Sequence, residues 1–525
     1  IVYKNRRIDY AEFKREADQF AKGLMKLGLK KGDHVVMWMP NLPEWNYANL
    51  ALAKIGAVTV TCNTRYKAFE VEYLVKQSDS VALIMVDRFL DIDYIKILRE
   101  IYPEIDSDNA GQLSAAKAPL LKNIIVLGSN LPRAAFSFDK TKDLGKGVPQ
   151  AELESCQRQV QMEDPVEMLY TSGTTGAPKG CLLSHKAMFY KCVVFSQIHE
   201  WTYKDSNLVA VPYFHIFGAM GMIAGSVMQA SKQVLMDVFT PKAALELLEK
   251  EKITMFSGVP TMFITILGDP EFSKYDLSAL RTGTIGAAPV PIEIMKKVID
   301  KAEGMGMDAT VVYGLTESTG GTHWTRLGDP IEKRVSTVGR ATPEIIDKIV
   351  DMDSGKELPP GEEGEICIKG PTLMLEFYKK PEATAEKIRD GWLYTGDLGI
   401  KDKEGYLKIT GRVSDMIIVG GFNTYPAEIE NFYLTIPKIL DVSIVGVPDE
   451  KFGEVVMAYV IPKEGATITE QEIISYAKEK IANFKVPRYV EIVKEFPMTG
   501  SGKVQKFKQQ EMAMAKYNLK KVETA

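Results

Sequence analysis

The residues best suited to chemistry in this chain form a loop rich in threonine, serine and glycine. It reads Tyr170-Thr-Ser-Gly-Thr-Thr-Gly-Ala-Pro-Lys179-Gly180, follows an apolar run and precedes a stretch that Ser184 could begin as a helix. Hydroxyl groups, unobstructed backbone N–H groups and a lysine together suit a polyphosphate. The spacing differs from a Walker A loop, because no Gly-Lys pair in it is followed by serine or threonine. A flexible linker would share the composition, but the place between a strand and a helix favours phosphate binding.

Four further segments carry polar residues between apolar ones. They are Val312–Ser318, Trp392–Gly399, Gly411–Glu428 and Pro497–Gln505. With the threonine-rich loop, and in this order, they resemble the motifs of the adenylate-forming superfamily, which includes acyl-CoA synthetases, firefly-type luciferases and the adenylation domains of peptide synthetases. The resemblance covers essentially the whole chain. The segments Asn483–Arg488 and Phe496–Lys503 look most like the medium-chain and related acyl-CoA synthetase branch.

The resemblance implies a site for ATP or AMP with Mg²⁺. The loop from Thr171 to Lys179 would hold the β- and γ-phosphates, and Thr316 would touch the α-phosphate. Glu317 would bind Mg²⁺, a hard cation that prefers carboxylate and phosphate oxygens.

The sugar and the base are expected at other segments. Asp397 would accept hydrogen bonds from both ribose hydroxyls, and Arg412 would help to fix the ribose end. Tyr313 and the small residues 286–289 would form the adenine slot and give the base room. In full, the nucleotide-binding residues that the resemblance implies are Thr171, Ser172, Gly173, Thr174, Thr175, Gly176, Gly286, Ala287, Ala288, Pro289, Tyr313, Gly314, Asp397 and Arg412.

The reaction that the resemblance implies has two steps. A carboxylate attacks the α-phosphorus of ATP, which yields an acyl-adenylate and pyrophosphate, and a thiol then displaces AMP. The first step needs no general base, because a carboxylic acid with a pKa of about 4–5 is already ionised at pH 7. Two anions must meet, so the implied catalytic residues are Lys503, Lys179, Thr316 and Glu317. Because the mixed anhydride hydrolyses easily, a closing lid that excludes water is expected.

The acid is expected to bind at an apolar segment. The acyl-pocket residues implied are His215, Phe214, Phe217, Gly218, Thr284 and Gly320. A histidine in apolar sequence is explained as well by a place in the core as by a role at the pocket entrance, so both interpretations of His215 stay open. Amino-acid-activating relatives have an aspartate in the segment that corresponds to the one around His215, where it forms an ion pair with the ammonium group of their substrate. This segment has no carboxylate, which disfavours an amino-acid substrate.

Two further sites are implied in the last part of the chain. Gly420 and Gly421 lie where relatives line the tunnel for the pantetheine arm of CoA. Ser414, two residues after Arg412, occupies the hinge position of the lid. That position is commonly Asp or Lys in relatives, so its electrostatics differ here.

A scaffold must bring these segments together. Short β-branched runs alternate with amphipathic stretches through the first two-thirds of the chain, which predicts an α/β architecture with largely parallel sheets. The expected strands are His34–Met39, Val58–Cys62, Val81–Val86, Ile124–Leu127, Glu167–Tyr170, Leu208–Val211, Val234–Met236, Thr254–Ser257 and Thr310–Tyr313. The expected helices include Tyr10–Leu27, His185–Gln197 and Pro241–Lys250.

We expect two domains. Residues 1–411 form a large AMP-binding domain of stacked, mostly parallel sheets with helices and a small β-barrel-like element, in subunits of about 1–165, 166–333 and 334–411. Residues 412–525 form a small, mobile α+β lid. In the lid we expect strands at Asp441–Val447 and Val455–Ile461, followed by a helix that Thr469 and Glu472 begin with a capping box.

Composition disfavours several other classes of protein. The chain has 525 residues, with 65 Lys and Arg against 69 Asp and Glu, so no basic field favours nucleic acid. The five cysteines form no CxxC pair, which disfavours a disulfide scaffold or a cysteine zinc site and fits a reducing cytoplasm. Leu208–Ser231 has no charged residue, but Pro212, His215 and its glycines favour a buried strand and helix over a membrane span. The chain opens at Ile1 rather than at methionine, which leaves a cleaved targeting signal open.

These observations predict an AMP-forming acid–thiol ligase that uses ATP and Mg²⁺ and takes CoA as the thiol. The acid is expected to be a small carboxylic acid that is medium-chain, branched or cyclic, including aromatic. The same site could run in reverse and make ATP from acyl-CoA, AMP and pyrophosphate. A luciferase-like oxygenase and a carrier-protein-loading adenylation enzyme share the motifs and stay open as alternatives, as does a homodimer. Neither a nucleic-acid partner nor a transmembrane segment is expected, and the expected location is cytoplasmic.

Overall fold

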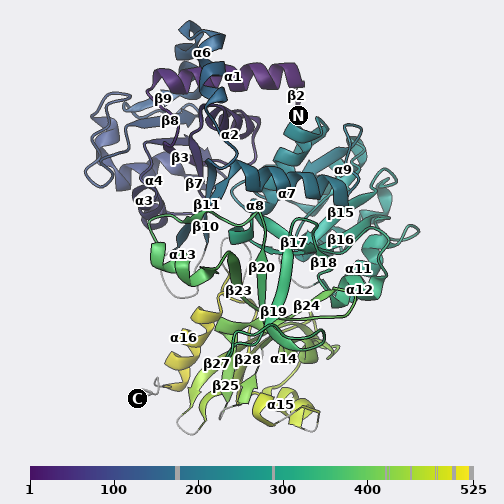
Figure 1. The fold of residues 1–525 in the computed structure, drawn as a ribbon. Helices are drawn as coiled ribbons and strands as arrows, with labels where there is room; N and C mark the ends of the chain where they lie inside the picture. Colours follow the sequence, from purple (N-terminus) through teal and green to yellow (C-terminus); the bar gives the residue numbers. More distant parts are fainter. Residues whose placement is uncertain are drawn as a thin grey trace. The chain divides into compact units, whose positions relative to one another are not determined.

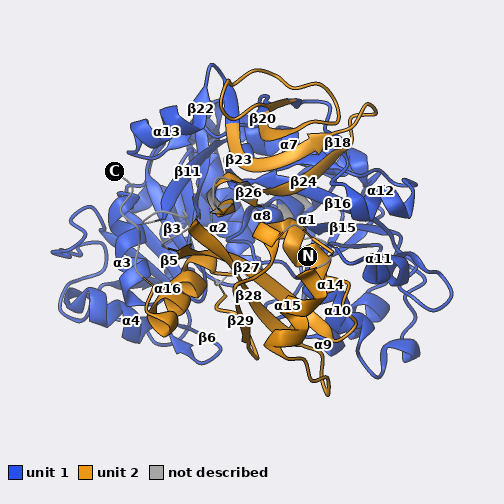
Figure 2. Cartoon of the chain, turned by 90° about the horizontal axis from the view of Figure 1, so that it is seen from below, with its two compact units in different colours: residues 1–347, 368–393 blue, residues 348–367, 394–525 orange. Residues whose placement is uncertain are grey.

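The computed structural model describes residues 1–525 without 172–177, 287–289, 420–421, 425, 450–451, 479, 482, 499–503 and 520–525, and without the side chains of 222, 224, 226, 414, 418, 422 and 423. Its contacts group the chain into two compact units (Figure 2). Unit 1 contains residues 1–347 and 368–393, and unit 2 contains residues 348–367 and 394–525. The predicted lid lies within unit 2, and the domain boundaries stay a prediction.

One sheet of unit 1 has eight strands in the order β21-β11-β10-β4-β3-β5-β8-β9. Its strands are β3 (His34–Trp38), β4 (Val58–Thr61), β5 (Ala82–Val86), β8 (Asn123–Leu127), β9 (Ala135–Ser137), β10 (Pro165–Thr171), β11 (Lys179–Ser184) and β21 (Glu376–Phe377). The strands from β10 to β9 pair in parallel, whereas β11 and β21 are antiparallel to their neighbours. Strands β3, β4 and β5 are buried along their whole length, as is usual for parallel strands covered on both faces.

The other large sheet of unit 1 has nine strands in the order β18-β17-β16-β15-β14-β12-β13-β1-β2. Its strands are β1 (Val2–Tyr3), β2 (Arg6–Arg7), β12 (Ser206–Val209), β13 (Lys232–Leu235), β14 (Met255–Phe256), β15 (Thr282–Gly286), β16 (Asp308–Leu315), β17 (Gly320–Trp324) and β18 (Arg340–Ala341). Pairing is parallel from β16 through to β1, and the outer strands β17, β18 and β2 are antiparallel. The predicted α/β class with mostly parallel sheets is therefore confirmed.

Helices follow the strands of both sheets (Figure 1). They are α1 (Tyr10–Lys26), α2 (Pro43–Ile55), α3 (Ala68–Gln77), α4 (Tyr94–Ile101), α5 (Phe138–Leu144), α6 (Gln150–Arg158), α7 (His185–Ile198), α8 (Ile216–Ile223), α9 (Pro241–Lys250), α10 (Pro260–Leu267), α11 (Ile292–Ile299), α12 (Ile331–Ser336) and α13 (Pro381–Lys387). Side-chain caps mark the starts of some of these helices: Asp9 accepts from the backbone N–H of Glu12 at 2.7 Å, and Ser184 from that of Ala187 at 3.1 Å. The three helices predicted from periodicity begin at the predicted residues.

The sequence does not predict β11, which lies between the threonine-rich loop and α7. The sequence predicts a helix that Ser184 begins, and it assigns no element to the residues between the loop and Ser184. Instead, residues 179–184 pair with β10 along their whole length, because the apolar side chains of Cys181 and Leu183 are buried in a cluster with Met188 and Phe377. Only after this strand does Ser184 cap α7.

The charge-free stretch from Leu208 to Ser231 forms the end of β12, α8 and the π-helical turn η3 (Ala224–Met228). Leu208 and Val209 are almost completely buried, and so are Ala219 and Met220 on α8. In the described part of the chain, no helix has both the length and the apolar character that a membrane crossing requires. The prediction of a buried strand followed by a helix is therefore confirmed.

Unit 2 contains a sheet in the order β26-β25-β28-β27, whose pairs are antiparallel, with β29 beside β28 and parallel to it. Its elements are β25 (Ile417–Val419), β26 (Phe422–Thr424), α14 (Pro426–Leu434), β27 (Ile439–Asp449), β28 (Gly453–Pro462), α15 (Glu470–Lys478), β29 (Tyr489–Ile492) and α16 (Lys506–Tyr517). The backbone N–H of Thr469 donates to Glu472 Oε2 at 2.7 Å, and that of Glu472 donates to Thr469 Oγ1 at 3.2 Å, so the predicted capping box begins α15. A further five-stranded sheet, whose strand β22 belongs to unit 1, contains β19 (Ile346–Val350), β20 (Glu363–Lys369), β22 (Ile388–Arg389), β23 (Trp392–Lys401) and β24 (Leu407–Arg412).

Strand β10 carries a completely buried carboxyl group, that of Glu167. Asn49 on α2 donates from Nδ2 to Glu167 Oε1 at 3.2 Å and lies 3.3 Å from Thr59 Oγ1. Burial raises the pKa of Glu167 from 4.5 to about 7, because the ionised form loses its hydration, and the bond from Asn49 offsets only part of this effect.

We expect Glu167→Gln to change the pH dependence of stability. Below pH 4.5 the carboxyl is protonated in both folded and unfolded chains; as pH rises towards about 7, only the folded chain keeps the proton, so the free energy of unfolding falls. At pH 8 the glutamine variant should exceed the parent in stability by about 3 kcal/mol, and the advantage should shrink at pH 5. Melting temperatures at the two pH values measure this, with exposed Glu154→Gln as the matched control. Parallel curves for Glu167→Gln and the parent would contradict the assignment.

Candidate active site

The two ends of the threonine-rich loop lie side by side. Strand β10 ends at Thr171 and β11 begins at Lys179, and these two residues face each other in the antiparallel ladder. The Lys179 side chain is half-buried, and its Nζ lies 5.3 Å from the centroid of the Phe377 ring. The predicted phosphate-binding residues Ser172, Gly173, Thr174, Thr175 and Gly176 lie outside the described residues. The hairpin therefore places the lysine at the base of the loop.

Thr316 and Glu317 lie in a tight turn between β16 and β17. With Ser318 they form a single 3₁₀ turn, η5. Ser318 Oγ lies 3.0 Å from the carbonyl oxygen of Leu315 and 2.8 Å from that of Gly320, so one hydroxyl closes both ends of the turn. Glu317 therefore projects from a backbone that is held in place on both sides.

The hairpin and the turn are joined through a short edge segment, residues 374–378. The backbone N–H of Met374 donates to the carbonyl oxygen of Glu317 at 2.8 Å. At the other end of the segment, the N–H of Tyr378 donates to the carbonyl oxygen of Gly180 at 2.8 Å. Sequence reasoning missed this segment, because its residues form no polar motif.

The Glu317 carboxylate acts electrostatically on Cys181 of β11. Burial, and then the negative charge of Glu317, raise the pKa of the Cys181 thiol well above its usual range, so this cysteine is a protonated core residue. Glu317 itself is half-buried, and its carboxylate makes no hydrogen bond or ion pair with any residue in the described part of the chain. Such a carboxylate fits Mg²⁺, which binds through one or two carboxylates together with phosphate oxygens of a substrate.

Tyr313 and Gly314 lie near the end of β16. The rings of Tyr313 and His323 on β17 have centroids 5.9 Å apart. A Cβ added to Gly314 would lie 2.0 Å from the carbonyl oxygen of Gly320, so the close approach of the two strands requires glycine there. The other predicted adenine-slot residues are Gly286, which ends β15, and Ala287, Ala288 and Pro289, which lie outside the described residues.

In unit 2, β23 and β24 bring the two predicted ribose residues together. Asp397 faces Arg412 in the antiparallel ladder, and Arg412 Nε donates to Asp397 Oδ1 at 2.7 Å. Asp397 is only 3% exposed, whereas the Arg412 side chain is 45% exposed. Ser414 follows in a 3₁₀ turn, η6 (Val413–Asp415). Its side chain, and the predicted CoA-tunnel and catalytic residues Gly420, Gly421 and Lys503, lie outside the described part of the chain.

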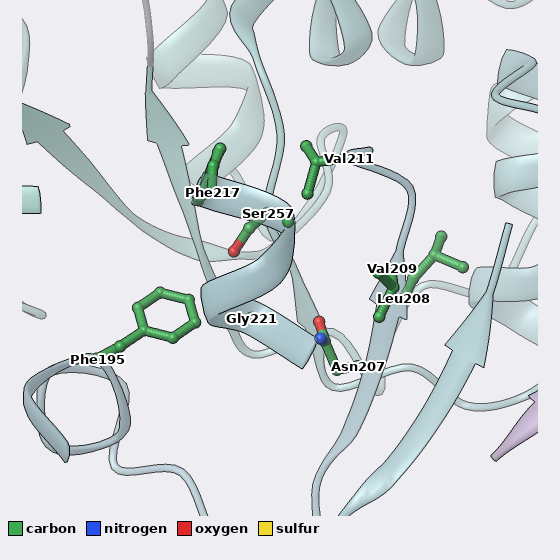
Figure 3. A pocket seen from close by; sticks show the side chains of 9 residues that line it. Phe195, Asn207, Leu208, Val209, Val211, Phe217, Gly221 and Ser257 are labelled. Carbon is green, nitrogen blue, oxygen red and sulfur yellow. The ribbon is translucent and has the colours of Figure 1, made fainter. Parts of the chain in front are cut away.

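The predicted acyl-pocket residues divide into two groups. Phe217 and Gly218 line a small cavity of about 10 Å³ beside α8 (Figure 3). The other residues that line it are Phe195, Asn207, Leu208, Val209, Val211, Gly221 and Ser257. Phe214, His215, Thr284 and Gly320 do not line this cavity. His215 lies just before α8, where its Nδ1 accepts from the backbone N–H of Phe217 at 3.3 Å.

The Thr284 hydroxyl takes part in a buried hydrogen-bond network. It lies 2.7 Å from His199 Nε2 and 3.0 Å from Thr310 Oγ1, and it accepts from Trp324 Nε1 at 3.3 Å. Burial lowers the pKa of His199 to about 3, so the imidazole is neutral. The small size of Thr284 thus serves the packing of β15 against α7 and β17, and its role in binding the acid stays a prediction.

A buried ion pair lies behind β17, and sequence reasoning missed it. The Lys191 side chain on α7 is completely buried; its Nζ donates to the carbonyl oxygen of Gly321 at 2.6 Å and to Glu344 Oε1 at 2.9 Å. Burial lowers the pKa of Lys191 to about 8, although Glu344 opposes this effect. The pair ties α7 to the strand that begins with Gly320. A lysine among the apolar positions of the helix was the only signal in the sequence.

Two family models cover most of the chain. Residues 1–378 match the AMP-binding enzyme family, and residues 428–503 match the C-terminal domain of the same enzymes. The chain belongs to the AMP-binding enzyme family. The predicted adenylate-forming superfamily is thereby confirmed.

Individual members of the AMP-binding enzyme family match over nearly the full length. The chain is 43% identical to YngI of Bacillus subtilis (strain 168), which is named as an acyl-CoA synthetase, over 99% of this chain and 95% of the relative. It is 36% identical to the mitochondrial medium-chain acyl-CoA ligase ACSF2 of Bos taurus, over 99% of this chain and 85% of the relative. These relatives confirm the predicted class, an acyl-CoA synthetase.

A solved structure of the family shows the same fold. O-succinylbenzoate CoA synthetase (MenE) from Bacillus subtilis superposes with a TM-score of 0.78 at 26% identity, covering 97% of this chain and 96% of that one. That enzyme is known in complex with ATP and a magnesium ion, and also with its acyl-adenylate intermediate.

In this AMP-binding enzyme we expect Lys191→Met to be strongly destabilising. The substitution would leave the Glu344 carboxylate buried without its cation, which typically costs about 3–5 kcal/mol. The melting temperature should fall clearly, and the double variant Lys191→Met with Glu344→Gln should recover part of the loss. Lys186→Met on the same helix, where the side chain is 41% exposed, is the control. Equal losses in Lys191→Met and in the control would show that the buried pair contributes nothing.

Proposed function

We propose that this AMP-binding enzyme activates a medium-chain, branched or cyclic carboxylic acid with ATP to an acyl-adenylate and then transfers the acyl group to CoA. The observation that carries the proposal is the joint anchoring of Lys179 and Glu317. One edge segment, residues 374–378, holds the hairpin of Lys179 and the turn of Glu317 in a single unit. A cation and a metal-binding carboxylate beside a hydroxyl-rich loop suit the phosphates of ATP.

In the first step, these residues must bring two anions together, the carboxylate of the acid and the triphosphate of ATP. The acid enters as a carboxylate, so the protein must offset repulsion with the phosphates rather than remove a proton. Lys179 would place its charge on the phosphates, and the Thr316 hydroxyl would orient the α-phosphate. Mg²⁺, held by Glu317 together with phosphate oxygens, would supply further positive charge. Asp397, oriented by Arg412 at 2.7 Å, would bind the ribose hydroxyls.

The relatives support the choice of acid. ACSF2 is named a medium-chain acyl-CoA ligase and matches 99% of this chain. The small cavity beside α8 is lined mainly by apolar side chains, and Phe217 of the predicted acyl pocket is among them.

The test is a panel of carboxylic acids, scored for pyrophosphate release and for CoA-thioester formation in separate assays. Pyrophosphate and thioester should both form with medium-chain acids. Adenylation without thioester would contradict CoA as the acceptor and favour a carrier protein, whereas light emission with a luciferin would favour an oxygenase. ATP formation from acyl-CoA, AMP and pyrophosphate tests the reverse direction.

We expect Lys503→Ala to separate the two half-reactions. Lys503 lies in the predicted lid, and it would offer its charge only in the adenylating arrangement. Adenylation should fall by about 10²–10³, the usual cost of losing a transition-state charge contact. Thioester formation from pre-made acyl-adenylate should be nearly unchanged. Lys508→Ala, on exposed α16 surface, is the control. Equal losses in both half-reactions would refute this role.

We also expect Glu317→Gln to change the response to Mg²⁺. Glutamine keeps the shape but removes the charge that a hard cation requires. Adenylation should weaken, and the Mg²⁺ concentration for half-maximal rate should rise severalfold. Titration of the metal at saturating ATP measures this, with exposed Glu303→Gln as the control. An unchanged metal dependence would leave Glu317 with a structural role alone.

A further inference from the structure

The cavity beside α8 contains a buried amide without a partner. Asn207 lies on β12 and is only 6% exposed, yet no residue in the described part of the chain makes a hydrogen bond with its side-chain amide. Its backbone is engaged in the sheet, where it faces Gln233 on one side and Met255 on the other. Figure 3 shows the amide directed at α8 near Gly221.

Such an arrangement is unfavourable unless something else binds the amide. Most buried polar groups in native proteins have a partner, and an unsatisfied one costs about 1–3 kcal/mol. A leucine has nearly the same shape as asparagine and would fill this position without that cost. The amide therefore indicates a ligand atom or a water molecule in the cavity.

A second polar group faces the same cavity from the neighbouring strand. Ser257 follows β14, which pairs with β12, and it is only 9% exposed. Its Oγ accepts from the backbone N–H of Thr284 at 3.0 Å. The hydroxyl hydrogen remains available to an acceptor in the cavity. Asn207 offers both donors and an acceptor, so the two side chains together can bind a hydroxyl or a carbonyl group.

The opposite wall leaves room for such a group. A Cβ added to Gly221 on α8 would meet no atom within 4 Å, so the helix surface facing Asn207 is open there. Apolar side chains form the rest of the lining, among them Phe195, Val209 and Phe217. A single polar end group on a hydrocarbon chain matches this distribution.

We propose that Asn207 and Ser257 recognise a hydrogen-bonding group, a hydroxyl or a carbonyl, at the far end of the acid. The inference rests on the proposed function and narrows its substrate class: the enzyme activates oxygenated medium-chain acids in preference to the plain saturated ones. The cavity volume of about 10 Å³ corresponds to one water molecule, which such an end group would displace.

The experiment compares matched pairs of acids. Hexanoic, octanoic and decanoic acids are each set against the same acid with a hydroxyl or an oxo group at the far end, and kcat/KM is measured by pyrophosphate release. We expect the oxygenated member of the best pair to be favoured about tenfold, because the plain acid leaves the buried Asn207 amide without a hydrogen-bond partner. In Asn207→Leu the preference should reverse towards the plain acid, and in Ser257→Ala it should shrink.

Thermal unfolding separates recognition from a structural role. Asn207→Leu removes no hydrogen bond within the protein, so its melting temperature should equal or exceed that of the parent. Asn49→Leu is the matched control, because Asn49 donates to Glu167 and lies 3.3 Å from Thr59, and its melting temperature should fall. A similar fall in Asn207→Leu would overturn the proposal.

The failures of the two proposals are distinguishable. Equal kcat/KM for both members of every pair would mean that the amide holds only a water molecule, which overturns this inference and leaves the proposed function intact. Absence of pyrophosphate release with every acid would overturn both.

Discussion

The candidate active site in unit 1 depends on two backbone hydrogen bonds made by one edge segment. Residues 374–378 bond to Glu317 at one end and to Gly180 at the other. Backbone bonds of this kind are short and directional, and they allow little variation in the spacing of the strands that they join. A lysine and a carboxylate from distant parts of the sequence are thereby held relative to each other before any nucleotide binds. Preorganisation of this sort is what a reaction between two anions requires.

The core around this region contains polar groups that would be costly if they were unpaired. Lys191 is satisfied by Glu344 and a carbonyl oxygen, and His199 is satisfied by two threonine hydroxyls. These pairs link α7 to β15 and to β17, on either side of β16, which leads to Glu317. Because a half-satisfied network would cost more than an apolar core, each pair also specifies one packing of these elements. Asn207 departs from this pattern, which is why its environment points to a ligand.

Small residues in this protein serve two different purposes. At Gly283 a Cβ would lie 1.7 Å from the carbonyl oxygen of Phe256, and at Gly314 it would lie 2.0 Å from that of Gly320. Glycine at these positions allows strands to approach closely. At Gly221, by contrast, a Cβ would enter open space beside the cavity. The sequence alone does not distinguish the two cases, because a glycine in the sequence does not show whether another backbone or empty space lies beside its Cα.

The sequence by itself determined the family, the α/β class and the local starts of α1, α7, α9 and α15. These properties depend on short-range patterns: motif order, periodicity and the caps at Asp9, Ser184 and Thr469. Only the tertiary structure revealed β11, the edge segment 374–378 and the Lys191–Glu344 pair. It alone showed that the Thr284 hydroxyl already takes part in hydrogen bonds within the protein. Each of these depends on residues far apart in the chain, and the burial and hydrogen-bond partners of a side chain are set by neighbours that its local sequence does not contain.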